Sequence, residues 1–452
     1  MKKITLYLSA GLLCLSLSAA AQTKQWTLEE CIRHAIEHNI ELKQKEQEQI
    51  GREIELNTSQ HSWLPNLNAS IGQNFSFGRI QGNDGVYNSR NGASSSLNVQ
   101  TQMPLFDGFK IYNSIAADEL NLKAAIASLE KAKEDLAINV ASYFLQVLYN
   151  KEILRIAELQ VELTNEQVGK TEILVETGKI PTSQLYDIKA QLAKDEVTLA
   201  EARNNVSLAL LDLTQALELE RLGTDFEVYV PDIEDAVGEY LQSLLPPDHI
   251  YDNAVATKAQ IKEQEYLLER QKKLLKVSQA DYYPNLSLGA NYNTSAIKYY
   301  SGLMKDKGER NISFKSQFSD NSREAIGVTL SIPIFNRFQV RNNVRSARVA
   351  ITNRELMMDN SKKVLYKEIQ QAYFNATAAQ EKYIASEKSV DASKEAFVYA
   401  EERYAAGKST VFEYNESKTK YSQSMAEQAQ AKYNFIFRTK ILDFYNGIPI
   451  TL

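Results

Sequence analysis

Residues 59–68 read SQHSWLPNLN and residues 278–287 read SQADYYPNLS, so one ten-residue pattern occurs twice at an offset of 219. Two later pairs agree at an offset of 229: Met103-Pro-Leu-Phe106 with Ile332-Pro-Ile-Phe335, and Thr177-Gly-Lys179 with Ala406-Gly-Lys408. The change of offset places a longer loop in the second copy. Internal repetition on this scale predicts two halves of similar structure.

Each half has the same expected order of elements, namely a helix, two strands, a very long helix and a shorter returning helix. The first half, residues 22–222, is expected to hold helices at about 28–60, 109–176 and 182–219 and strands at about 67–80 and 94–105. The second half, residues 248–452, is expected to hold helices at about 248–280, 338–405 and 410–445 and strands at about 286–299 and 324–334.

The expected strands alternate apolar and polar residues. In residues 67–77 the apolar side chains Leu67, Ala69, Ile71, Phe75 and Phe77 share one face, and the other face is polar or glycine. Period-two alternation indicates strands, and strands of this length fit the tilted span of a bilayer. A small half-buried sheet in a soluble domain is the alternative. Aromatic residues at the strand ends favour a membrane interface: Trp63, Phe106, Tyr282, Tyr283 and Phe335.

Four strands are too few to close a barrel, and a sheet in lipid cannot leave its edge hydrogen-bonding groups open. If the strands cross a membrane, copies of the chain must combine their sheets. No stretch after the first 21 residues approaches 18 uncharged apolar residues, so a transmembrane helix is not expected.

The helices are expected to be far longer than those of an ordinary domain. Only 9 prolines and 18 glycines are spread over 452 residues, and a helix of about 65 residues would reach roughly 100 Å. Apolar residues recur in heptads from Leu122 to Val175, which predicts a left-handed coiled coil. Each long helix meets a glycine, Gly178 or Gly407, where we expect the tip of a helix hairpin.

Residues 223–247 interrupt the heptads with an acidic stretch that contains no Lys or Arg. We interpret it as a connecting region wrapped around the long helices, with a short strand at 226–230, and a disordered linker is the alternative. Residues 1–21 have the layout of a signal peptide, so the mature chain keeps only Cys31 and cannot form an internal disulfide. The net charge of −6 argues against a nucleic-acid partner.

Several segments resemble the TolC-like outer-membrane efflux protein family over nearly all of the mature chain. They are residues 26–39 (WTLEECIRHAIEHN), residues 104–108 (PLFDG), residues 403–407 (RYAAG), and the duplication itself. The resemblance implies a mainly α fold with a transmembrane β-barrel: a homotrimer in the outer membrane of a Gram-negative bacterium, whose 12-stranded barrel stands on a long periplasmic α-helical barrel. It also implies a periplasmic adaptor protein and an inner-membrane transporter as partners, and no cofactor.

In this family, inward carboxylates on the helix after each tip close the periplasmic end. The same count from the tip glycines gives Glu413 and Glu416 in the second half and Gln184 and Asp187 in the first. Gln184 carries no charge, so the first-half ring is expected to be weaker. The resemblance further implies adaptor docking at the tips, on these residues: Gly178, Lys179, Arg403, Tyr404, Gly407 and Lys408.

The expected function is therefore passive conduction rather than catalysis. An exit duct for small-molecule efflux and an exit duct for type I protein secretion are both compatible with these residues, and a periplasmic coiled-coil scaffold is a third reading. His34 and His38 lie four residues apart, as in a zinc site. Since the second half has Asn253 and Thr257 there, we expect a packed or solvated helix end and no metal.

Overall fold

The computed structural model describes residues 25–81, 85–89, 91–219, 226–231, 238, 241, 244–301 and 312–451. The expected signal peptide and most of the acidic connecting region lie outside these residues. Within the described ranges, no helix combines the length and the apolar composition needed to cross a membrane. The chain forms two compact units: Met1–Gln47 with Ala127–Lys262 and Asn360–Leu452, and Glu48–Ile126 with Glu263–Asp359.

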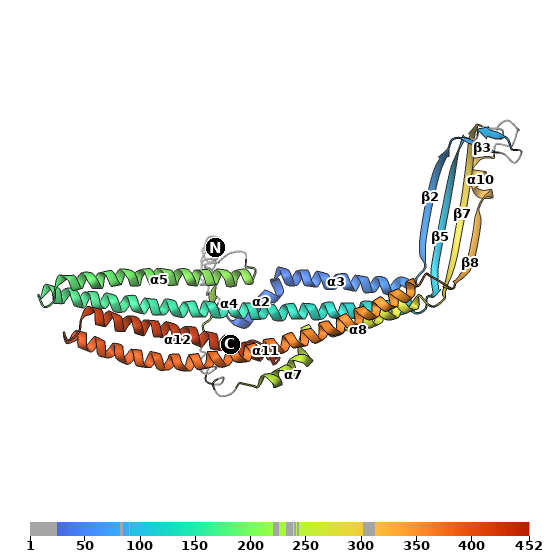
Figure 1. Ribbon diagram of the computed structural model, residues 1–452. Coiled ribbons are helices and arrows are strands. Elements are labelled where there is room, and N and C mark those ends of the chain that lie inside the picture. The colour runs from blue at the N-terminus through green and yellow to red at the C-terminus, as the bar shows by residue number, and fades with distance from the viewer. Residues whose placement is uncertain are drawn as a thin grey trace, which may run out of the picture. The chain divides into compact units, whose positions relative to one another are not determined.

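The long and returning helices occur in the same order in both halves (Figure 1). Helices α4 (Lys110–Glu176) and α11 (Gln339–Ala405) have 67 residues each. The returning helices α5 (Thr182–Ala216) and α12 (Val411–Tyr445) have 35 residues each. Some of the predicted heptad positions of α4 are buried, namely Leu129, Val140, Val147, Ala157, Thr164, Val168 and Thr171, whereas Ile126 and Tyr143 are exposed.

The first helix of each half is broken, which corrects the expectation of single helices at 28–60 and 248–280. The first half has α2 (Leu28–His38) and α3 (Ile40–Gln60), and the second has α7 (Pro247–Thr257) and α8 (Ala259–Ala280). The breaks fall at the equivalent residues Asn39 and Lys258, each with ψ 130°. Asn39 then accepts the Leu42 N–H at 3.0 Å, so it ends one helix and caps the next.

Four antiparallel strands form one sheet in the order β2-β5-β7-β8: β2 (Asn66–Ser76), β5 (Asn91–Phe106), β7 (Asn285–Ser301) and β8 (Arg323–Ser331). The central pair joins the two halves, because β5 belongs to the first and β7 to the second. The strand expected at 67–80 ends at Ser76 and is followed by the short pair β3 (Arg79–Gln81) and β4 (Tyr87–Ser89). The strand expected to reach 334 ends at Ser331, just before Ile332-Pro333.

The strand register collects apolar side chains on one face of the sheet. Ile71 lies opposite Leu97, and Val99 lies between Ala69 and Tyr292. Much of this face is uncovered: 85% of Ile71 is exposed. The other face is polar, with Asn68, Gln100 and Asn291 in one row. The short helix α10 (Phe314–Asp320) packs on β7, where the Thr294 hydroxyl donates to the Phe318 carbonyl at 2.6 Å.

Both halves turn from strand to long helix through the same backbone conformation. Two consecutive residues have positive φ at each corner, namely Gly108 (67°) with Phe109 (67°) and Arg337 (55°) with Phe338 (61°). The rings of Phe106 and Phe109 meet edge to face at 5.6 Å, and those of Phe335 and Phe338 do the same at 5.6 Å. The duplication therefore extends to the ring geometry at the strand ends.

In the unit that holds the helix tips, the described residues form three apolar clusters. The largest joins α2, α4, α5, α11 and α12, and Phe144, Leu213 and Phe435 are fully buried in it. Strand β1 (Gln25–Trp26) pairs in parallel with β6 (Glu227–Val228), and Val228 also lies in this cluster. Residues 226–231 of the acidic region are thus packed on the helices at the short strand β6.

Candidate functional site

The two helix hairpins turn through the same hydrogen-bond pattern. At the first tip the Gly178 N–H donates to Val175 and the Lys179 N–H to Leu174, and at the second Gly407 donates to Tyr404 and Lys408 to Arg403. These are Schellman motifs, which require a left-handed residue that glycine adopts without steric strain. The structure places Lys179, Arg403 and Lys408 exposed around the tips, while the Tyr404 ring packs 5.4 Å from Tyr414.

Two of the four expected gate residues line one cavity. Asp187 on α5 and Glu416 on α12 face a space of about 590 Å³, together with Gln191 and Phe412. The carboxylate of Glu416 is also paired with Lys420 at 2.7 Å. The structure thus brings one acidic residue from each half together near the tips.

The other two expected gate residues lie outside this lining. Glu413 is in the first turn of α12, where its backbone N–H is capped by the Thr410 hydroxyl at 3.2 Å. Its carboxylate lies 3.7 Å from the exposed Arg403. Gln184 lies in the first turn of α5, where its N–H donates to the Pro181 carbonyl. Both residues therefore belong to the turns that begin the returning helices.

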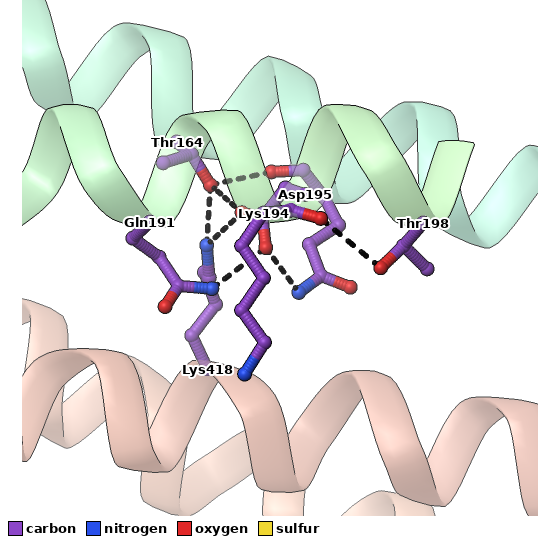
Figure 2. Close-up of polar contacts among 7 residues, drawn as sticks. Thr164, Gln191, Lys194, Asp195, Thr198 and Lys418 are labelled. Atoms are coloured by element: carbon purple, nitrogen blue, oxygen red, sulfur yellow. Dashed lines mark hydrogen bonds and ion pairs between the residues drawn. The ribbon is translucent and has the colours of Figure 1, made fainter. Parts of the chain in front are cut away.

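A buried ion pair joins the two hairpins beside the cavity lined by Asp187 and Glu416. The Lys418 ammonium on α12 lies 2.9 Å from the Asp195 carboxylate on α5, and their side chains are 1% and 2% exposed. Lys418 also donates to the hydroxyl of Thr164 on α4. Figure 2 shows the Lys418 side chain rising from α12 into this group, with Gln191 beside it.

The Asp195 carboxylate is fully surrounded by donors. Gln160 and Gln191 donate to one of its oxygens at 3.0 and 2.7 Å, and Thr164 and Lys418 reach the other at 2.5 and 2.9 Å. Burying a charge is strongly unfavourable unless it is paired and hydrogen-bonded. Gln191 also lines the cavity that contains Asp187 and Glu416, so this cluster lies next to those acidic residues.

Sequence reasoning missed this cluster. The chain has 51 Lys and Arg and 57 Asp and Glu residues, and nothing in the pattern around Asp195 or Lys418 separates them from residues on solvated helix faces. Their contact joins residues 223 positions apart. The relative rotation of two packed helices cannot be inferred from the sequence of either helix alone.

Several buried polar atoms near the tips have no hydrogen-bond partner among the described residues. They are Gln167 Nε2, Thr171 Oγ1, Tyr404 Oη, Ser409 Oγ and Asn415 Oδ1. Buried polar groups without partners weaken packing by about 1–3 kcal/mol each, unless water reaches them.

The expected membrane-interface rings lie next to the strand ends. Tyr282, Tyr283 and Phe335 are exposed, and Trp63 and Phe106 are half-buried. The histidine pair examined for metal binding is packed instead: the His34 and His38 rings stack at 4.0 Å, and Trp26 meets His34 edge to face at 5.2 Å. Across the described residues, no group of three His, Cys, Asp or Glu side chains is placed to hold a metal ion.

A duplicated chain with a four-stranded, partly apolar sheet and two long helix hairpins is the architecture of outer-membrane channel proteins. A family profile described as outer membrane efflux protein matches residues 31–218 and 250–437, one segment in each half. The chain belongs to this family, and it is a protein of the outer membrane. The resemblance drawn from the sequence is thereby confirmed.

The similar proteins found by sequence have low identity to this chain but align with most of its length. Outer membrane protein TolC of Escherichia coli is 21% identical over 88% of this chain and 77% of its own length. The alkaline protease secretion protein AprF of Pseudomonas aeruginosa is 21% identical over 77% of this chain and 69% of its own length.

Solved structures share the fold at low sequence identity. A crystal structure of CusC superimposes with a TM-score of 0.76 at 15% identity, covering 96% of both chains. The open state of the MtrE outer membrane channel of Neisseria gonorrhoeae gives 0.72 at 17% identity, covering 94% of this chain and 90% of that one. These channels confirm the predicted fold class.

Proposed function

We propose that three copies of this chain form an exit duct through the outer membrane. The observation that carries the proposal is the sheet: one face is apolar and exposed, and each edge strand, β2 or β8, has a single partner among the described residues. A sheet in lipid must satisfy its edges. Joining β8 of one copy to β2 of the next, three times, gives a closed barrel of twelve strands whose polar face lines the duct.

We assign the duct to efflux of small molecules, driven by an inner-membrane transporter through a periplasmic adaptor that docks on the hairpin tips. Membership in the outer membrane efflux protein family supports this assignment. Export of a protein is the second candidate, which the similarity to AprF, named for protease secretion, supports. In both cases the energy comes from the partner, and the chain itself catalyses no reaction.

The duct hypothesis is tested by extraction and conductance. The mature protein should require detergent, migrate as a trimer that dissociates on heating, and open ion-conducting pores in planar bilayers. Copurification with an adaptor and transporter from cells should then identify the system it serves. A stable monomer in water without detergent would overturn the proposal.

The periplasmic constriction is proposed to lie at Glu413, Glu416, Gln184 and Asp187. Threefold symmetry would bring copies of these side chains around one axis, where like charges repel unless a cation or base neutralises them. Combining Glu413→Ala with Glu416→Ala shortens both side chains and removes their ion pairs with Arg403 and Lys420. We expect a higher single-channel conductance in planar bilayers, and unchanged conductance would exclude these residues from the constriction.

A further inference from the structure

A basic cavity lies where the sheet meets its helices, within the unit Glu48–Ile126 and Glu263–Asp359. Its volume is about 920 Å³, and it is lined by the corner before α4, the end of α8 and the start of α11. Four cationic side chains contribute to the lining: Lys276, Arg341, Arg345 and Arg348. None of the proposed gate or docking residues lies in it.

The four cationic side chains line the same cavity. Arg341, Arg345 and Arg348 recur at helical spacing on one face of α11, and Lys276 approaches from α8. Among the described residues, the lining contains no Asp or Glu. Since the chain as a whole carries a net charge of −6, four positive charges in one cavity are a local concentration that favours an anionic ligand.

The remaining lining supplies neutral donors and rings. The side chains of Asn113, Gln279, Tyr112 and Tyr282 carry hydrogen-bond donors, and Phe109 and Tyr283 add apolar surface. Guanidinium groups bind phosphate through two parallel hydrogen bonds, which a lone ammonium cannot form. A phosphate attached to an apolar group matches this combination better than a free inorganic ion does.

The position of the cavity indicates which kind of phosphate-containing ligand can reach it. Strand β5 ends at Phe106, and the lining residue Gly108 follows shortly after it. Strand β7 begins at Asn285, and the lining residue Tyr283 comes shortly before it. If the strands cross the membrane as proposed above, the cavity lies at the level of the lipid headgroups on the helix side. We propose that it binds the phosphate of an anionic phospholipid in the periplasmic leaflet of the outer membrane.

Native mass spectrometry of the detergent-purified trimer tests this inference. Dioleoylphosphatidylglycerol, dioleoylphosphatidylcholine and inorganic phosphate are titrated separately and in competition. The test variant combines Arg341→Gln, Arg345→Gln and Arg348→Gln. The control combines Arg354→Gln, Lys362→Gln and Lys363→Gln, which removes the same charge from α11 outside the cavity. We expect the test variant to bind phosphatidylglycerol at least about tenfold more weakly, with the control unchanged and phosphatidylcholine weak throughout.

Each other outcome overturns the inference. Equal losses in both variants would indicate a general charge effect, and displacement of the lipid by millimolar inorganic phosphate would indicate a free-anion site. Dissociation of the test variant into monomers in lipid-free detergent would assign the arginines to subunit contacts. Conductance in planar bilayers distinguishes failure of this inference from failure of the proposed duct. A trimer that conducts ions but does not prefer phosphatidylglycerol to phosphatidylcholine contradicts only the lipid site.

Discussion

The two hairpins have the same backbone and different polar chemistry. Thr164 and Asp195 in the first half occupy the positions of Ser393 and Ser424 in the second, and both pairs are hydrogen-bonded between the long and the returning helix at 2.5 Å. One member of the first pair is a carboxylate, and the second pair is neutral. The duplication has therefore kept the contact between helices while changing its charge.

Two equivalent lysines show the consequence of this difference. Lys418 on α12 reaches across to Asp195 and is 1% exposed, whereas its counterpart Lys189 on α5 pairs with Glu172 at 2.8 Å with 46% exposure. A lysine at one position of the repeat is thus buried between hairpins in one half and solvated in the other. Equivalent residues in a duplicated chain need not share a role.

Replacing the buried lysine should have the largest effect. Lys418→Met leaves the Asp195 carboxylate buried without its cation, and breaking a buried pair in this way costs about 3–5 kcal/mol. Lys189→Met should cost less than about 1 kcal/mol, since exposed pairs contribute little. Amide hydrogen exchange of the detergent-purified protein, read across residues 411–424 for Lys418→Met and across the equivalent residues 182–195 for Lys189→Met, measures the local opening free energy of each variant.

A second substitution sharpens the comparison. Asp195→Ser together with Lys418→Met gives the first half the neutral contact of the second, and most of the lost protection should return because no unpaired charge remains. Equal effects of Lys418→Met and Lys189→Met would show that the two lysines are equivalent after all.

We expect the strand-to-helix corners to respond to substitution in opposite directions, and the glycine corner should give the next largest effect. A Cβ atom at Gly108 would lie 2.7 Å from the Ala280 carbonyl oxygen and 2.8 Å from the Tyr283 Cβ, and φ there is 67°. Gly108→Ala should therefore destabilise the protein by about 2 kcal/mol. The thermal midpoint in detergent measures it, with Gly51→Ala as control, because Gly51 lies in helix α3 with open space around it. A midpoint for Gly108→Ala at or above that of the unchanged protein would contradict the strain argument.

Periodicity and repetition predicted the long helices, the tips and the strands, because each depends on residues near one another in the chain. Features that depend on contacts between residues far apart in the chain were not predicted from the sequence. The helix breaks at Asn39 and Lys258 were missed because neither position has a proline or glycine. The Lys418–Asp195 pair was missed because burial of a charge depends on the neighbouring hairpin, and only Asp187 and Glu416 of the expected gate share a cavity.

The two helix breaks differ in charge, which predicts a pH effect. Lys258 is buried at the second break, 3.6 Å from Glu134 and with its ammonium over the Phe444 ring. Burial raises the pKa of Glu134 above its usual 4.5, and the Lys258 cation opposes this rise. Burial also lowers the pKa of Lys258.

Lys258→Asn gives the second break the residue of the first, which can cap a helix. At neutral pH it also leaves the Glu134 carboxylate without its cation, so the variant should be modestly less stable than the unchanged protein. Without the cation the pKa of Glu134 should rise further. A raised folded-state pKa contributes stability that is present at low pH and is lost as pH rises through that pKa. The variant should therefore gain stability relative to the unchanged protein on acidification from pH 7 towards 5, by at most about 1.4 kcal/mol per pH unit. Thermal midpoints across this range measure the slope, and parallel curves for the two proteins would contradict the coupling.

The smallest expected effect tests the second corner. Arg337 adopts φ 55° where its counterpart is Gly108, and a left-handed residue with a Cβ is strained by roughly 1–2 kcal/mol. Arg337→Gly removes this strain, but glycine gives the unfolded chain more freedom, by about 0.5–1 kcal/mol. The net result should be a gain of less than about 1 kcal/mol. A raised thermal midpoint for Arg337→Gly and a lowered one for Gly108→Ala would support this account. They would show that the second corner adopts the same left-handed backbone conformation as the first, although arginine disfavours it. A lowered midpoint would instead mean that Arg337 makes contacts worth more than the strain.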